Sequence, residues 1–175
     1  MSDEKTSEEL VSDNAEELMH SDKDQLAELE PKMRMAMTAR EQGKDGEARK
    51  LFESILQSEP RLAEPRLELA HMAAIAEDWD EAQTQARLAV DILQRGGQWT
   101  EDVAPKVLLG FALNLLGELI VRPLEEGDLF LTNRAEFNAR WNEASEVFAR
   151  CLEADPENVD ARRNATRYRS LELEN

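Results

Sequence analysis

The feature that most constrains this chain is a pattern of small and large side chains that occurs twice. It lies in residues 43–60, GKDGEARKLFESILQSEP, and again in residues 141–156, WNEASEVFARCLEADP. In each copy an alanine is followed four residues later by phenylalanine, as in Ala48 and Phe52, and the copy ends at a proline. A repeated helical pattern of this kind is typical of stacked helical units that offer a surface to a partner. The chain is therefore predicted to be all-α.

Apolar residues at helical spacing continue this organisation along the chain. Pro31 is predicted to begin one helix, because proline suits the first helical position, and Gly43 breaks the pattern before a second helix over residues 45–58. Pro65 begins the next predicted helix, and another follows Trp79. The elements therefore pair into helical hairpins.

The period of these hairpins resembles that of the tetratricopeptide repeat, a helix–turn–helix unit of 34 residues. Ala48 and Ala82 are 34 residues apart and fall on the signature alanine of that family. Further matches lie at Leu69, Ala70, Leu109, Gly110, Ala144, Phe148 and Pro156. The second repeat departs from the pattern, with Ala86 for the aromatic residue and Gln94 for the proline. The resemblance implies a helical-hairpin solenoid, a TPR-like superhelix, with repeats at about residues 29–62, 63–96 and 103–158.

An insertion of about 22 residues separates the two predicted helices of the third repeat. It covers about residues 121–140 and contains an apolar group, Leu124, Leu129, Phe130 and Leu131. A polar linker would not carry these side chains. They are predicted either to cover the apolar end of an extended helix or to form a lip over a groove.

The two ends of the chain are predicted to differ in charge. Residues 1–30 hold 11 of the 38 acidic residues, and they are interpreted as a largely disordered tail in which a short helix can begin near Ser21. Residues 31–173 are interpreted as the helical domain. A capping helix over residues 159–173 closes it and carries a basic cluster, Arg162, Arg163, Arg167 and Arg169. This cluster is either a solvated outer face or an electrostatic contact for an acidic segment.

The formal net charge of −17 argues against nucleic acid or an anionic membrane as a partner, and it favours basic partners. No run is apolar and long enough to predict membrane insertion, and the first residues lack the apolar core of a secretory signal, so a cytoplasmic protein is expected. The one cysteine, Cys151, lies on an apolar stripe and is interpreted as a core thiol.

The sequence contains no set of residues that predicts catalysis. His20 and His71 are isolated, and with one cysteine they do not make a zinc site. Glycine-rich phosphate loops and other catalytic spacings are absent from the sequence. We therefore expect neither enzymatic activity nor a cofactor.

The resemblance implies a concave groove that is lined by the first helix of each repeat. Carried onto this sequence, the groove positions are Met33, Arg34, Met37, Arg40, Leu67, Glu68, His71, Ile75, Val107, Leu108, Phe111, Asn114 and Leu115. Family members that hold the acidic C-termini of chaperones have lysine or asparagine where Met33, Met37 and Glu68 stand here, which disfavours that partner class. Phe111 is the predicted central anchor, unless the helix over residues 101–121 is buried on all sides.

The predicted function is a protein–protein interaction scaffold or adaptor that binds an apolar peptide or an amphipathic helix of another protein. One alternative is a secretion-type chaperone, because the chaperones of type III translocators are similar in size, acidity and repeat number. Another alternative is an assembly subunit, in which copies of this chain contact one another as a homo-oligomer.

Overall fold

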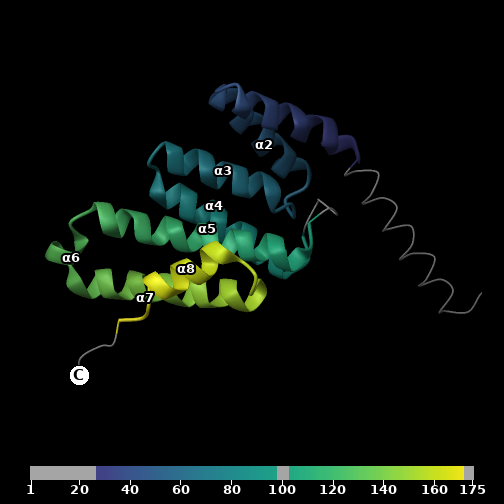
Figure 1. The fold of residues 1–175 in the computed structure, drawn as a ribbon. Helices are drawn as coiled ribbons and strands as arrows, with labels where there is room; N and C mark the ends of the chain where they lie inside the picture. The colour runs from purple at the N-terminus through teal and green to yellow at the C-terminus, as the bar shows by residue number, and fades with distance from the viewer. Residues whose placement is uncertain (1–26, 98–102, 172–175) are drawn as a thin grey trace, which may run out of the picture. The chain divides into compact units, whose positions relative to one another are not determined.

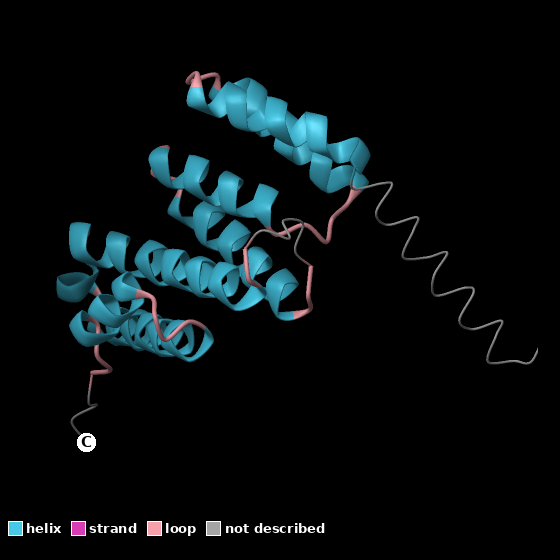
Figure 2. Cartoon of the chain, turned by 45° about the vertical axis from the view of Figure 1, so that its right-hand side comes forward, coloured by secondary structure: helices cyan, strands magenta, loops and turns pink. Residues whose placement is uncertain are grey.

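The computed structural model of the chain describes residues 27–97 and 103–171. Helices dominate these two ranges, and no strand occurs in them (Figure 2). The predicted all-α class is therefore confirmed. The chain divides into two compact units, residues 1–51 and 52–175, and the boundary falls inside helix α2 (Asp45–Ser58). Most of the predicted acidic tail, residues 1–26, lies outside the described residues.

The first unit contains the helical residues 27–41 and the first half of α2. Gly43 turns the chain between them with a φ of 69°, a left-handed conformation that glycine adopts without steric cost. The predicted break at this glycine is confirmed. The predicted helix start at Pro31 is wrong, because residues 27–30 are already helical and Leu29 is buried on this helix at 6% exposure.

The second unit contains six further helices within the described residues. They are α3 (Glu64–Ile75), α4 (Trp79–Gln94), α5 (Pro105–Glu126), α6 (Leu129–Thr132), α7 (Arg134–Ala154) and α8 (Val159–Arg167). Helix α4 packs against both α3 and α5, α7 packs along α5, and α8 lies on α7 and α5 (Figure 1). Each long helix of this unit therefore packs on the one that follows it in the chain.

Alanine lets α4 approach its two neighbours. Ala82, Ala86 and Ala89 recur on one side of the helix and have no exposed surface. Gln83 lies next to them and donates a hydrogen bond from Nε2 to the carbonyl oxygen of Leu119 on α5 at 3.1 Å. A buried side-chain amide is thereby paired with a backbone acceptor, as a buried polar group requires.

Helix α5 is the central helix of the second unit. By length and composition it could cross a membrane, so the prediction that no run is apolar and long enough is wrong on these two criteria. In the structure 61% of its apolar window is buried inside the protein. Its predicted start at residue 101 is wrong, since residues 103 and 104 are not helical and Pro105 takes the first position. Its predicted end at residue 121 is also wrong, because the helix continues through Pro123 to Glu126.

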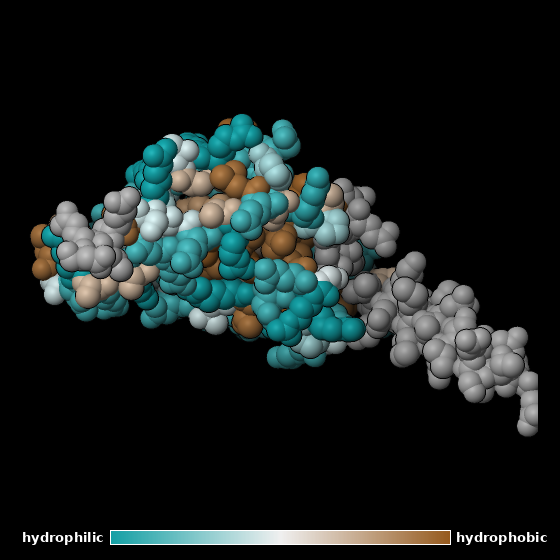
Figure 3. Space-filling view, turned by 90° about the horizontal axis from the view of Figure 1, so that it is seen from below, coloured by the Kyte–Doolittle hydropathy of each residue, from teal (hydrophilic) through white to brown (hydrophobic). Residues whose placement is uncertain are grey.

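The residues of the predicted insertion, 121–140, form the end of α5, the short helix α6 and the beginning of α7. Leu124 belongs to α5 itself and is buried at 4% exposure, so it packs inside the fold. By contrast, Phe130 and Leu131 on α6 are 46% and 83% exposed. In Figure 3 the brown apolar atoms at the left edge lie over α6, which Figure 1 places on the same side. Phe130 and Leu131 therefore leave an exposed apolar surface on α6, and the lip over a groove stays a prediction.

The capping helix α8 ends at Arg167 rather than at residue 173, so its predicted length is wrong. The next residue, Tyr168, turns into the core and is 4% exposed. Beyond it the backbone is held by side chains of α7: Trp141 Nε1 donates to the carbonyl of Arg169 at 2.8 Å, and the amide of Leu171 donates to Asn142 Oδ1 at 2.7 Å. These hydrogen bonds from α7 hold the backbone after the end of α8.

A continuous row of aromatic rings joins the core of the second unit to α6. From the buried Phe148 it passes to Tyr168, Trp141, Phe137 and the exposed Phe130, with ring centroids 5.3, 5.4, 5.6 and 5.1 Å apart. Each spacing lies in the range of favourable aromatic pairs. The row therefore ties α6, α7 and the residue after α8 together.

Cys151 is buried on α7, as predicted, and its thiol donates to the carbonyl of Gly110 at 2.9 Å. Burial raises the pKa of this thiol to about 11. Because the unfolded thiol ionises first, near pH 9, the unfolded state then binds fewer protons and stability falls as the pH rises.

We expect the free energy of unfolding of the wild type to fall by about 2 kcal/mol more than that of Cys151→Ala between about pH 9 and about pH 11. Urea unfolding of both proteins across that range, followed by circular dichroism, measures this difference. Parallel pH curves for the two proteins would contradict the assigned burial of the thiol.

Candidate functional site

A hollow of about 400 Å³ lies between α3 and α5 in the second unit. Its α3 side is made by residues near the end of that helix, together with the turn that leads into α4: His71, Ala74, Ile75, Glu77 and Trp79. Its α5 side is made by Leu115, Glu118, Leu119, Arg122 and Glu126. We call this hollow, together with the adjoining Phe111, the α3–α5 groove.

Large apolar side chains are exposed along the α3–α5 groove. Ile75 is 80% exposed on α3, and Phe111 and Val107 are 49% and 39% exposed on α5. Leu115 lies deeper, at 8% exposure. Removing side chains such as Ile75 and Phe111 from water contributes about 1.5–3 kcal/mol each, so this surface gains stability when it is covered.

His71 links the two sides of the groove. Its ring lies 6.2 Å from that of Phe111, centroid to centroid, with the two planes tilted by 36°. Its Nδ1 is 3.0 Å from the carbonyl oxygen of Leu67, and because a carbonyl accepts, Nδ1 is the donor. This hydrogen bond holds the His71 ring beside Phe111.

A polar network fixes the α5 side of the groove to α8. Asn114 Nδ2 donates to Glu118 Oε1 at 2.9 Å, and Asn164 Nδ2 of α8 donates to both Asn114 Oδ1 and Glu118 Oε1 at 3.0 Å. Asn164 is 5% exposed, so the network is anchored in the interior. It positions the Glu118 carboxylate, and it engages the amide of Asn114, which the resemblance assigned to partner binding.

The structure brings together the predicted groove residues of the second and third repeats. His71, Ile75 and Leu115 line the hollow, and Phe111 adjoins it through His71. Phe111 is exposed, so α5 is not buried on all sides. The other predicted positions of these two helices differ in exposure: Val107 is exposed, Glu68 and Leu108 are half-buried, and Leu67 is buried.

The predicted groove residues of the first repeat lie in the first unit. Met33 is buried at 9% exposure, whereas Met37 and Arg40 are half-buried. Arg34 is exposed and forms an ion pair with Glu30 one turn before it. Of these four predicted residues, Met33 has the least surface to offer a partner.

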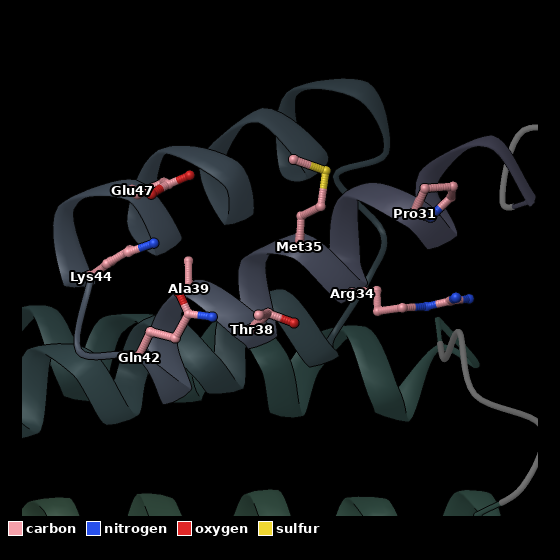
Figure 4. A pocket seen from close by; sticks show the side chains of 8 residues that line it. All are labelled: Pro31, Arg34, Met35, Thr38, Ala39, Gln42, Lys44 and Glu47. Atoms are coloured by element: carbon pink, nitrogen blue, oxygen red, sulfur yellow. The ribbon is translucent and has the colours of Figure 1, made fainter.

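The first unit has a hollow of its own, of about 470 Å³ (Figure 4). Side chains from the helical residues 27–41 and from the start of α2 converge on it, with Met35 contributing a 58% exposed apolar surface. Arg34 is the predicted groove residue that lines it, and Lys44 and Glu47 face it from the other segment. Its lining mixes charges of both signs around one methionine.

Sequence reasoning missed the part of the groove beyond Leu115. Glu118, Arg122 and Glu126 follow Asn114 at steps of four residues and so continue one face of α5. The family register ends its groove positions near Leu115, because its first helix is shorter than α5. Extending the same helical spacing along the apolar run would have found these residues.

The basic cluster of the capping helix is engaged within the chain. Arg163 pairs with Asp160 at 3.0 Å, and Arg167 pairs with Glu125 of α5 at 2.7 Å. Arg162 donates to the carbonyl of Pro156 at 2.8 Å. These contacts hold α8 in place and satisfy part of the charge that was predicted to receive an acidic segment.

Among the described residues, no set of three histidine, cysteine, aspartate or glutamate side chains is arranged to hold a metal ion.

No protein-family model matches the chain, and no curated protein matches it. The resemblance to tetratricopeptide repeats thus rests on the residues themselves. Its signature positions Ala48, Phe52, Ala144 and Phe148 all have no exposed surface. Complete burial at these positions is what close packing of helices requires.

Proposed function

We propose that this chain is a protein-binding scaffold that holds an apolar peptide, or the apolar face of an amphipathic helix, in its α3–α5 groove. The exposure of Ile75 and Phe111 beside a hollow of about 400 Å³ carries this proposal. Exposed apolar groups gathered at a concavity are typical of surfaces that bind another protein. An amphipathic helix laid into a groove is one of the recurring modes of such recognition.

The scaffold is of the tetratricopeptide-like kind in this proposal, a solenoid of hairpins with α8 as its cap. Two observations support it: α3, α4, α5 and α7 each pack on the next in order, and the repeated alanines and phenylalanines are buried. Stacking of neighbours in chain order is the defining property of a solenoid. The exposed Arg162 and Arg163 give α8 the polar outer face that a terminal unit requires.

Phe111→Asp is expected to weaken partner binding by at least about 30-fold, since a central aromatic anchor typically contributes 2 kcal/mol or more. The matched control is Leu131→Asp, which places the same charge on α6 at a side chain that is 83% exposed. Both variants should keep the wild-type circular dichroism spectrum. Quantitative pull-down from native extract with the three proteins as bait, followed by mass spectrometry, gives the comparison.

A partner that is depleted by Phe111→Asp and retained by Leu131→Asp supports the proposal. Equal recovery with both variants would show that the α3–α5 groove is not the binding surface. A secretion-type chaperone would hold its hydrophobic client in the same groove, so this comparison also tests that alternative.

A further inference from the structure

We propose that the segment held in the α3–α5 groove is basic: its apolar face covers Ile75 and Phe111, and its lysine or arginine side chains lie at the end near Glu77 and Glu126. This inference rests on the proposed function and adds the charge and direction of the partner. It is carried by the charges that border the groove and by the two helix ends that line it.

Carboxylates outnumber basic groups around the hollow. Glu77, Glu118 and Glu126 line it together with Arg122, whose Nε is paired with Glu126 Oε1 at 2.9 Å. The hydrogen bonds to Glu118 come from the neutral amides of Asn114 and Asn164, which leave its negative charge in place. The rim therefore has a net negative charge at neutral pH.

Two helices point their C-terminal ends at the same part of the groove. Helix α3 ends at Ile75 and α5 ends at Glu126, and both residues line the hollow. Each helix end carries a partial negative charge of about half an elementary charge. Neither helix has a basic residue in its last turn to offset it. The two ends thus add to the negative potential of the carboxylates.

This arrangement sets the chemistry of the occupant. An acidic or phosphorylated segment would meet like charge, and like charges juxtaposed at an interface repel and weaken binding. A segment with lysine or arginine beside its apolar face gains attraction and has one favoured direction. From Val107 to Glu126 the groove side of α5 measures about 29 Å, the length of a helix of about five turns.

The probes are two synthetic amphipathic helices of about five turns with the same leucine face, one with lysine and one with glutamate on its polar face. Their affinity for the full chain is measured by fluorescence anisotropy. The test variant is Glu77→Lys with Glu126→Lys. The control is Glu146→Lys with Glu153→Lys, which reverses two exposed carboxylates of α7 and so changes the net charge equally.

We expect the lysine peptide to bind at least about tenfold more tightly than the glutamate peptide. The Glu77/Glu126 variant should lose that preference, and the Glu146/Glu153 control should keep most of it. Phe111→Asp should weaken the binding of both peptides. Higher salt should weaken the binding of the lysine peptide to the wild type more than its binding to the Glu77/Glu126 variant, because salt screens exposed charges.

Failure of the two proposals gives different results. If both peptides bind equally and both depend on Phe111, the groove binds helices without regard to charge, and this inference is overturned while the proposed function stands. An equal loss of lysine-peptide binding in the two charge-reversal proteins would also overturn it, since attraction would then follow net charge. If Phe111→Asp changes neither affinity, the groove is not the binding surface and both proposals fall.

Discussion

Phe148→Ala is expected to lower the free energy of unfolding by about 3–5 kcal/mol, the cost of removing a large ring from a packed core. Phe148 has no exposed surface, and its ring stacks on Tyr168 with centroids 5.3 Å apart and planes 17° apart. On its other side it touches the backbone of α5 at Gly117. The loss is a large part of the roughly 5–15 kcal/mol that holds a domain folded.

The control for this substitution is Phe130→Ala, which removes a ring of the same aromatic row at its exposed end. Phe130 is 46% exposed, and its contacts are with Phe137 and with Arg134, whose guanidinium lies 5.0 Å from the ring centroid. It should cost less than about 1 kcal/mol. Urea unfolding of the three proteins, followed by circular dichroism, gives the comparison. Similar losses for both variants would mean that Phe148 is not part of a close-packed core.

Gly117→Ala is expected to destabilise the protein by about 1–3 kcal/mol or more, although alanine favours a helix over glycine by up to about 1 kcal/mol. A Cβ at this position would lie 2.4, 2.6 and 2.9 Å from three carbons of the Phe148 ring. Neither side can move freely, because α5 and α7 pack along their length and the ring is enclosed. The tight fit therefore outweighs the gain in helix propensity.

Gly46→Ala is the matched control, because a Cβ at that position in α2 meets no atom within 4 Å. It should leave stability unchanged or raise it by about 0.5–1 kcal/mol. Thermal unfolding of the wild type and the two variants gives the comparison. The midpoint of Gly117→Ala should be lower than that of the wild type, whereas that of Gly46→Ala should be equal to it or higher.

A double substitution tests the named contact directly. In a Phe148→Leu background the smaller side chain relieves the overlap, so Gly117→Ala should cost less there than in the wild type. The difference between the two costs is the coupling energy of the pair. Additive effects would place the strain of Gly117→Ala elsewhere in the structure.

The sequence pattern predicted the helical residues better than the limits of the helices. The spacing of Ala48 and Phe52, and of Ala144 and Phe148, reflects which side of a helix is apolar, and all four side chains are buried. Helix ends depend on contacts that lie far apart in the chain. Helix α8 ends before Tyr168 because the Tyr168 ring packs between Trp141 and Phe148. The residues next to Tyr168 in the sequence do not predict this packing.

The groove could be predicted only in part, because helical spacing is a local property and contacts between distant segments are not. His71, Ile75 and Leu115 were predicted from their positions along the first helix of each repeat, and all three line the hollow. The acidic end of the groove could not be found this way, because it needs α5 to continue through Pro123 and needs the ends of α3 and α5 to line the same hollow. Asn114 was assigned to partner binding from its register, but its amide is bonded to Asn164 from a helix 50 residues further on.

By itself the sequence determined that this chain is helical, because periodicity in side-chain polarity is a local property of the chain. Only the tertiary structure decided which apolar residues remain exposed. Leu108 and Phe111 occupy equivalent apolar positions in the sequence, yet one is half-buried and the other is 49% exposed. The difference depends on which neighbouring helix covers each side of α5, and packing between distant segments sets that.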